Sequence, residues 1–320
     1  MGLRREQVEF YFENGYLKAE GVFDPQEDLA PVIRAYEAEV DRRARTLHAE
    51  GRLSSLYENE DFAHRLARIA AEVPEAAQAL DIYLIRHPAM FRFLCNRKLH
   101  DVVESLIGPE IMCHPCQHLR AVAPTALASL SRTTDWHQDA GVLWPEADDH
   151  LVVTTWIPLI DVPEERGCLQ VIPGSHRYGL LQHGTGAGNR IPPERFPPGE
   201  ARPLPVRAGD MILFHNYVLH AALPNVTDTI RWSMDLRWQD PAKPTGRPFY
   251  PGFIVRSKAR PETVQLDYDE WRQRWEYALA VTKGVPINRW QAIDKGMIQP
   301  APEQVEHPTP EPVLVPAGAR

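Results

Sequence analysis

The chain has 320 residues, 43% of them hydrophobic, which is enough to bury a sizeable core in one large domain or two small ones. Its formal net charge of −8 argues against nucleic acid or an anionic membrane as the main partner, because both favour a basic protein face. The same charge leaves no broad positive surface for a very acidic substrate, although a local basic patch is still compatible with it.

Targeting signals and cysteine usage indicate the cellular compartment. The N-terminus has no hydrophobic signal segment, and no run of about 18 apolar residues predicts a membrane span. Four cysteines are too few for a disulfide scaffold in a chain of this length. We therefore expect a cytoplasmic protein with reduced thiols, and neither nucleic acid nor a membrane as its partner.

Residues 6–108 are predicted to be mostly helical. Apolar residues recur at helical spacing in 28–51, 62–73 and 99–107. Pro74 and Gly108 end the second and third of these segments, as expected for residues that stop helices. This part of the chain is predicted to support the remainder from outside.

After Gly108 the pattern changes to short apolar or alternating runs separated by turn residues, which predicts strands. We place them near 110–122, 134–138, 151–158, 168–172, 204–207, 211–214, 217–221 and 230–238. Several short strands at this spacing are typical of a β-sandwich or jelly roll.

Three further segments have a distinct composition. Residues 177–203 are rich in Gly, Pro and Arg and are long for a loop, so this segment is either functional or mobile. Helical spacing returns at 268–282. Residues 300–320 carry six prolines, a composition typical of a disordered tail.

The most informative segment contains His137 and Asp139. On an extended backbone, residues i and i+2 point to the same side, so the imidazole and the carboxylate are expected to lie together. A histidine from a distant strand would complete a set of two histidines and one carboxylate, which fills three positions on non-haem Fe(II) and leaves three open. A His-x-Asp triplet alone is weak evidence, because it also occurs in surface loops.

Downstream residues strengthen this interpretation. His215 and His220 are the candidates for the third ligand, and a separation of five would place them on opposite faces of one strand. Arg231 follows His220 by eleven positions, and a guanidinium pairs with a carboxylate in bidentate fashion. 2-Oxoglutarate chelates iron through its keto-acid end, so its far carboxylate requires such a partner. Ser233 shares the face of Arg231 and would add a hydrogen bond; the alternative for Arg231 is a structural salt bridge.

These residues belong to a wider pattern that resembles the phytanoyl-CoA dioxygenase family of Fe(II)/2-oxoglutarate oxygenases over most of residues 7–240. The resemblance rests on Phe12–Leu17, Gly21–Phe23, His137–Asp139, Trp156–Asp161 and Gly167–His176, together with His220, Asn225, Arg231 and Ser233. Each segment alone is unspecific, whereas their combination in this order is specific.

The resemblance implies a mainly β fold, namely a double-stranded β-helix (a cupin-like jelly roll) packed by N-terminal and C-terminal helices. One oxygenase domain is expected to cover residues 1–299. Within it, 6–108 would give helical support, 109–240 the jelly-roll core and 241–299 a C-terminal extension.

The resemblance also implies roles for individual residues. His137, Asp139 and His220 would bind Fe(II), the family spacing favouring His220 over His215, and Arg231 would hold 2-oxoglutarate. Trp156 matches an aromatic position after the first core strand and is expected to line the pocket. Family members often carry Ser where this chain has Ala222, so Ser233 is expected to compensate.

Other residues near this segment have open alternatives. Gln117 and Arg120 lie on opposite faces of the strand before the triad, and whichever looks inward would reach the cosubstrate or the substrate; Gln117 is assigned to the cofactor-binding set. Arg237 shares the face of Arg231 and either binds a substrate anion or forms a salt bridge. Cys113 and Cys116 are expected to be buried reduced cysteines, since no second CxxC pair completes a zinc site.

The predicted reaction is oxidation, most simply hydroxylation, of a small or medium organic metabolite such as a natural-product intermediate, coupled to decarboxylation of 2-oxoglutarate to succinate by O₂. Asp139 argues against a halogenase, in which a small residue replaces the carboxylate ligand. Two alternatives remain: a cupin-like metalloenzyme that uses no 2-oxoglutarate, and a catalytically inactive relative that only binds ligands.

Overall fold

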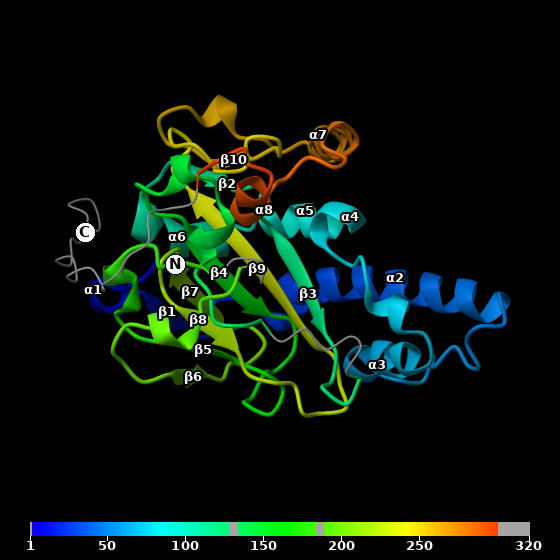
Figure 1. Ribbon diagram of the computed structural model, residues 1–320. Helices are drawn as coiled ribbons and strands as arrows, with labels where there is room; N and C mark the ends of the chain where they lie inside the picture. The colour runs from blue at the N-terminus through cyan, green and yellow to red at the C-terminus, as the bar shows by residue number, and fades with distance from the viewer. Residues whose placement is uncertain (1, 128–133, 184–188, 300–320) are drawn as a thin grey trace.

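The computed structural model describes residues 2–127, 134–183 and 189–299 (Figure 1). The predicted tail at 300–320 and part of the 177–203 segment lie outside these residues. The helices are α1 (Arg5–Asn14), α2 (Ala30–Ala49), α3 (Phe62–Glu72), α4 (Ile82–Ile85), α5 (Pro88–Leu94), α6 (Arg97–Ile107), α7 (Tyr268–Val281) and α8 (Arg289–Asp294). The predicted helices at 28–51, 62–73, 99–107 and 268–282 are therefore confirmed.

Ten strands form two antiparallel sheets. They are β1 (Tyr16–Ala19), β2 (Ile111–Cys113), β3 (His118–Val122), β4 (Val153–Pro158), β5 (Leu169–Val171), β6 (Arg202–Leu204), β7 (Met211–His215), β8 (His220–Ala222), β9 (Arg231–Gln239) and β10 (Phe253–Arg256). The larger sheet has the order β1-β7-β4-β9-β2-β10, with β3 also paired to β9, and the smaller sheet has the order β6-β5-β8.

The two sheets share an interior. Trp156, Ile212 and Phe214 of the larger sheet form one buried cluster with Val171 and Ala222 of the smaller sheet. Because successive side chains of a strand alternate between faces, the even-numbered residues of β4 and β7 and the odd-numbered residues of β9 look into this interior. This is the double-stranded β-helix predicted from the sequence.

The opposite face of the larger sheet packs against helices; in Figure 1, α2 to α5 lie to the right of the strands. Trp232 of β9 is fully buried there, stacked on Phe62 of α3 with ring centroids 4.5 Å apart. The ring of Tyr36 of α2 is tilted against the same indole, with ring centroids 6.1 Å apart. The alternation along β9 thus separates a hydrophobic outer face from an inner face that carries polar groups.

Three details differ from the prediction. β1 and β10 are strands of the larger sheet, although they lie in the segments predicted as helical support and C-terminal extension. Both have four residues, which is too short for alternation to be recognised. The predicted strand at 134–138 is only an isolated bridge between His137 and His220.

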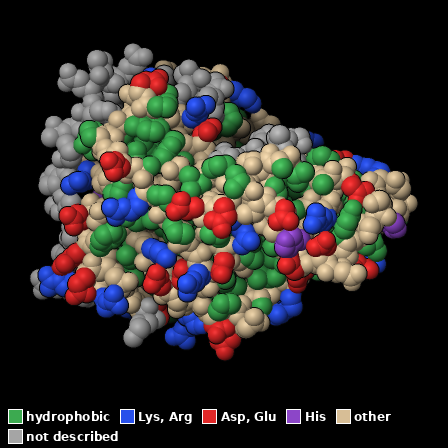
Figure 2. All heavy atoms as spheres, turned by 90° about the horizontal axis from the view of Figure 1, so that it is seen from below, with side chains coloured by type: hydrophobic (Ala, Val, Ile, Leu, Met, Phe, Trp, Pro, Cys, Tyr) green, Lys and Arg blue, Asp and Glu red, His purple; other side chains and the backbone are tan. Residues whose placement is uncertain are grey.

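Among the described residues, no helix is both long and apolar enough to cross a bilayer. On the face drawn in Figure 2, acidic and basic side chains are interspersed with hydrophobic ones, so neither sign of charge dominates it.

Candidate functional site

His137, Asp139 and His220 meet at one point of the interior. One ligand atom from each lies within 4.8 Å of the others, and all three residues are buried. The two imidazole rings have centroids 4.2 Å apart, and Nε2 of His137 lies 3.8 Å from Oδ1 of Asp139. The structure therefore brings together the three residues that the sequence predicted as ligands.

The backbone explains how residues 83 positions apart become neighbours. His137 and His220 exchange both backbone hydrogen bonds, each with an N to O distance of 3.0 Å. Asp139 then begins a short 3₁₀ helix, Asp139–Val142, which turns its side chain into the interior. The predicted strand at 134–138 is thus reduced to a single bridge, yet this bridge holds the two candidate histidine ligands side by side.

Hydrogen bonds orient both imidazoles. Nδ1 of His137 donates to the carbonyl of Asp135 at 2.8 Å, and Nδ1 of His220 donates to the carbonyl of Val218 at 3.0 Å. Each ring therefore keeps its Nε2 lone pair for a metal. Burial lowers the pKa of His137 to about 3, so this imidazole is neutral, as a ligand must be.

The carboxylate of Asp139 is held from two sides. Arg237 donates from NH2 to Oδ1 at 2.5 Å, and Thr154 donates from Oγ1 to Oδ2 at 2.5 Å. Although burial raises the pKa of Asp139, the charge of Arg237 and the hydrogen bond from Thr154 act against burial, and the pKa lies well below its usual range. The carboxylate is thus ionised and available to a cation. Arg237 forms the salt bridge that was one of its two predicted roles.

Two neighbouring residues, not predicted as site residues, position the ligands. Gln138 is fully buried, donates to the carbonyls of Gly179 and Tyr217 at 2.8 and 2.6 Å, and accepts from Leu181 N at 2.7 Å. Ser175 accepts from the backbone N of Leu219 at 2.8 Å, directly before His220. Their signal in the sequence was position alone: Gln138 stands between two ligands, and Ser175 lies in a recognised family segment.

Arg231 and Ser233 lie on the inner face of β9. Arg231 is 2% exposed, donates to the carbonyl of Gly167 at 2.8 Å and lies 5.5 Å from the ring centroid of Trp156. Its Nε and the hydroxyl of Ser233 are buried without a hydrogen-bond partner. Within the described residues, Arg231 forms no ion pair with a carboxylate. Burial lowers its pKa to about 10, and the side chain remains a cation at neutral pH.

The sequence left open whether Gln117 or Arg120 looks into the barrel, and the structure answers this question. The amide of Gln117 donates to the carbonyls of His114 and Arg237 at 2.6 and 2.9 Å and accepts from Arg237 N at 3.1 Å. Gln117 therefore joins the strands β2, β3 and β9 and does not line the pocket. Arg120 lies opposite Ser233 in the register, on the inner face, and lines the pocket.

The remaining candidates have structural roles. His215 lies with its ring 5.0 Å from that of His176, away from the metal ligands, and His176 bonds the carbonyl of Phe12 at 3.0 Å. Gly174 N donates to Asn14 O at 2.8 Å, so the N-terminal segment is tied to the Gly-Ser-His turn. All four cysteines are free, including Cys113.

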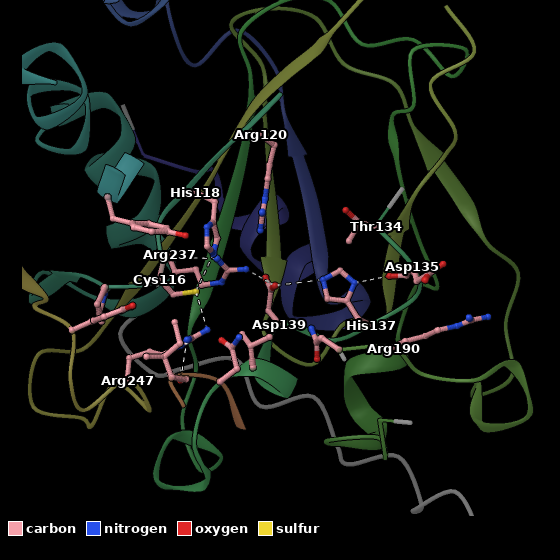
Figure 3. A pocket seen from close by; sticks show the side chains of 17 residues that line it. Cys116, His118, Arg120, Thr134, Asp135, His137, Asp139, Arg190, Arg237 and Arg247 are labelled. Carbon is pink, nitrogen blue, oxygen red and sulfur yellow. Dashed lines mark hydrogen bonds and ion pairs between the residues drawn. The ribbon is translucent and has the colours of Figure 1, made fainter. Parts of the chain in front are cut away.

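A pocket of about 400 Å³ opens beside His137 and Asp139 (Figure 3). Its walls come from six parts of the chain. They include Tyr83, Pro115, Cys116, His118, Arg120, Thr134, Asp135, Val142, Asn189, Arg190, Arg237, Arg247, Tyr250, Ile287 and Asn288. The segments 177–203 and 241–299 were expected to shape the pocket, but the sequence did not show which of their residues line it; they supply Asn189 and Arg190, and Arg247, Tyr250, Ile287 and Asn288.

Comparison with known proteins agrees with this geometry. The family model described as phytanoyl-CoA dioxygenase (PhyH) matches residues 11–233. The 1-deoxypentalenic acid 11-beta-hydroxylase of Streptomyces exfoliatus is 27% identical over 251 residues, covering 72% of this chain and 79% of that protein. The enzyme of the same name from Streptomyces arenae is 34% identical over 124 residues, covering 35% of this chain and 43% of that protein.

Solved structures show the same fold. The apo form of the non-heme monooxygenase ThoJ has a TM-score of 0.54 and 20% sequence identity, and the match covers 88% of this chain and 97% of that one. The similarity extends beyond the β core, since it includes most of the flanking helices.

Proposed function

The chain belongs to the phytanoyl-CoA dioxygenase family of Fe(II)/2-oxoglutarate-dependent oxygenases, and from this premise we propose that it hydroxylates a small or medium organic metabolite. The observation that carries the proposal is the convergence of His137, Asp139 and His220, with their ligand atoms within 4.8 Å of one another. Two imidazoles and one carboxylate are the donor set of non-haem Fe(II) oxygenases.

The residues present fit both the metal and the cosubstrate. The two Nε2 atoms and the ionised Asp139 carboxylate are free to coordinate Fe(II). Arg231 and Ser233 each present a buried polar atom without a partner, which a carboxylate of 2-oxoglutarate would satisfy. We assign Trp156 to the wall of this site because it lies against the Arg231 guanidinium. Ala222 offers no hydroxyl, so Ser233 is the side chain that supplements Arg231.

When bound, Fe(II), 2-oxoglutarate and O₂ supply the oxidising power, and the cosubstrate leaves as succinate and CO₂. The protein's own residues do the positioning. Arg231 fixes the far end of the cosubstrate inside the barrel, and Arg237 and Thr154 fix the carboxylate plane of Asp139. Gln138 holds the segment at 179–181 over the ligands. The buried interior excludes water, which protects reactive species from side reactions.

The substrate class follows from the pocket and from the relatives. A volume of about 400 Å³ suits a small or medium organic molecule. The two curated relatives named above carry names of hydroxylases of 1-deoxypentalenic acid. We therefore favour a natural-product-like metabolite over a large carrier-bound substrate.

We propose that residues 1–299 act as one oxygenase domain in the cytoplasm. The main hydrophobic cluster runs from Val8 to Trp275, so the N-terminal helices, the larger sheet and α7 share one core. The four free cysteines suit a reducing compartment.

The deciding experiment is an anaerobic titration of the metal-free protein with Fe(II) and 2-oxoglutarate, followed by the visible iron-to-keto-acid charge-transfer band. The wild type should show the band, and His220→Ala should lose it. His215→Asn is the matched control: it changes the competing histidine and should keep the band.

Turnover is tested separately by measuring succinate. Asp139→Ala should abolish hydroxylation, and full activity in that variant would overturn the ligand assignment. Metal binding without a band in the wild type would instead indicate a metalloenzyme that does not use 2-oxoglutarate. A band without succinate in the presence of candidate substrates would indicate a relative that only binds its ligands.

A further inference from the structure

The pocket beside the metal ligands is unusually cationic for a chain with a formal net charge of −8. Four arginines line it, Arg120, Arg190, Arg237 and Arg247, against two carboxylates, those of Asp135 and Asp139. In Figure 3, Arg237 and Arg247 lie near Cys116 on one side of Asp139, whereas Arg190 lies beyond His137 and points away from them. A concentration of one sign of charge in a cleft favours a ligand of the opposite sign.

Arg247 stands out among these arginines. It is 5% exposed, donates from NH1 to the carbonyl of Ile287 at 3.0 Å, and its NH2 lies 3.6 Å from Sγ of Cys116. Its Nε has no hydrogen-bond partner. No carboxylate in the described part of the chain forms an ion pair with it. Burying a guanidinium that has no carboxylate partner costs free energy unless another anion pairs with it.

The other two inner arginines are already paired with carboxylates. Arg237 binds Asp139 at 2.5 Å, and Arg120 lies 3.3 Å from the carboxylate of Asp235. Arg120 is nevertheless open to the pocket, with 45% of its side chain exposed. Arg247 is therefore the inner arginine that has no carboxylate partner among the described residues, and Arg120 adds to the positive field.

The pKa of the Cys116 thiol shows the effect of this positive charge. Burial raises its pKa, but Arg237, Arg247 and His118 outweigh burial and lower the pKa to about 5. At neutral pH the thiolate is shared by Arg237, Arg247 and His118, so the wall favours negative charge where Arg247 points and Arg247 is only partly compensated. The lining also includes the apolar or aromatic side chains of Tyr83, Pro115, Val142, Tyr250 and Ile287, beside the polar His118, Thr134, Asn189 and Asn288.

We propose that Arg247 binds an acidic group of the substrate, so that the substrate is an organic acid, a carboxylic acid or a phosphate monoester, with an apolar body. The acidic group docks at Arg247 beside Cys116, and the body extends past the apolar and aromatic side chains of the lining toward His137 and Asp139. This inference rests on the proposed function, because it takes the same pocket as the substrate site. It deepens that function by naming the group by which the substrate is held.

The test compares an acid with its neutral counterpart on the anaerobic enzyme loaded with Fe(II) and saturating 2-oxoglutarate. Saturation keeps the cosubstrate from competing as an anion. The probes are 4-phenylbutanoate, 4-phenylbutanamide and 3-phenylpropyl phosphate, and calorimetry gives each Kd. We expect at least one acid to bind at least about tenfold more tightly than the amide, since charge-assisted hydrogen bonds are about twice as strong as neutral ones. The tighter acid identifies the type of acidic group.

The variant Arg247→Met should abolish the preference of the enzyme for acid over amide. The matched control is Arg260→Met, an exposed arginine of the same C-terminal segment outside the pocket, and it should keep the preference. Equal binding of acids and amide in the wild type, no binding of any probe, or an unchanged preference in Arg247→Met would each overturn the proposal. If Arg247→Met does not fold, Arg247→Lys replaces it, and the preference for acid over amide should become smaller without reversing. The comparison of acid and amide binding by the wild type then still tests the proposal.

The charge-transfer band of the same samples separates the two proposals. A normal band without a preference for acids overturns the anchoring role of Arg247 alone. An absent band, by contrast, overturns the proposed use of 2-oxoglutarate.

Discussion

The guanidinium of Arg237 lies 2.5 Å from Oδ1 of Asp139, deep in the barrel, where the two side chains are 6% and 3% exposed. Arg237 also donates from NH1 to the carbonyl of Cys116 at 3.1 Å, which fixes it in place. The carboxylate that we propose as a metal ligand thus has a cationic neighbour. That neighbour compensates the carboxylate charge in the protein without metal and orients the carboxylate in the protein with metal.

This pairing predicts how Arg237→Met changes stability. In the metal-free protein the variant leaves the carboxylate of Asp139 buried without a cation, so the free energy of unfolding should fall by about 3–5 kcal/mol. Fe(II) would replace the missing positive charge, so the loss should be smaller in the loaded protein. Urea unfolding with a chelator, and again anaerobically with Fe(II), measures both values.

Thr154→Val is the control, because it removes the other hydrogen bond to Asp139 but no charge. Its loss should be about 1 kcal/mol and nearly the same with and without metal. Equal losses for Arg237→Met in the two states would contradict the compensating role of Arg237.

The substitution Arg231→Met should separate cosubstrate binding from stability. It removes a buried cation that has no carboxylate partner among the described residues, so the free energy of unfolding of the metal-free protein should stay the same or rise. The Kd for 2-oxoglutarate, read from the charge-transfer band, should rise by about tenfold to a hundredfold, while Fe(II) still binds. A destabilised variant with unchanged Kd would make Arg231 a structural residue.

The meeting of the three candidate metal ligands could be predicted from the sequence, because local spacing and family segments point to them. His137 and Asp139 are two positions apart, and His220 and Arg231 lie in an ordered pattern with them. The long helices were predictable for a similar reason, since α2 has twenty residues and repeats its apolar pattern several times.

Features that depend on long-range contacts were not predictable. Whether Gln117 or Arg120 looks inward depends on the register of β3 against β9, and no local pattern fixes it. Arg237 pairs with Asp139, and Arg247 lines the same pocket as Asp139. Both relationships bring together segments that lie about a hundred residues apart in the chain. The four-residue edge strand β1 is specified by its partner β7 more than by its own sequence.

The N-terminal segment allows a test of packing at Gly15. Gly15 ends α1 with φ +77°, and a Cβ at this position would collide with the ring of His176. Gly15→Ala should therefore lower the free energy of unfolding by about 2–3 kcal/mol, from backbone strain and from the collision. The double variant Gly15→Ala/His176→Ala should relieve the collision, so that the two changes are not additive. Additive losses in a double-mutant cycle would show that the ring can move aside freely.

The buried histidines predict a pH dependence of stability that does not involve the metal ligands. Burial lowers the pKa of His100 to about 4 and that of His114 and His215 to about 3, against about 6.5 in an unfolded chain. Below pH 6.5 the unfolded chain binds protons that the folded protein does not. Stability therefore rises with pH through this window and falls on acidification, by up to about 1.4 kcal/mol per pH unit for each such histidine.

Urea unfolding between pH 5 and 6.5 with a chelator isolates this effect, because carboxylates of the unfolded chain titrate near pH 4 and remain ionised. His100→Gln removes one of the titrating groups. His100 bonds the carbonyl of Leu94 at 2.8 Å and packs on Trp238, so the variant will lose some stability at every pH. The informative quantity is the slope, which should decrease by about one proton relative to the wild type. An unchanged slope would mean that His100 is protonated in the folded protein, against the burial that the structure gives it.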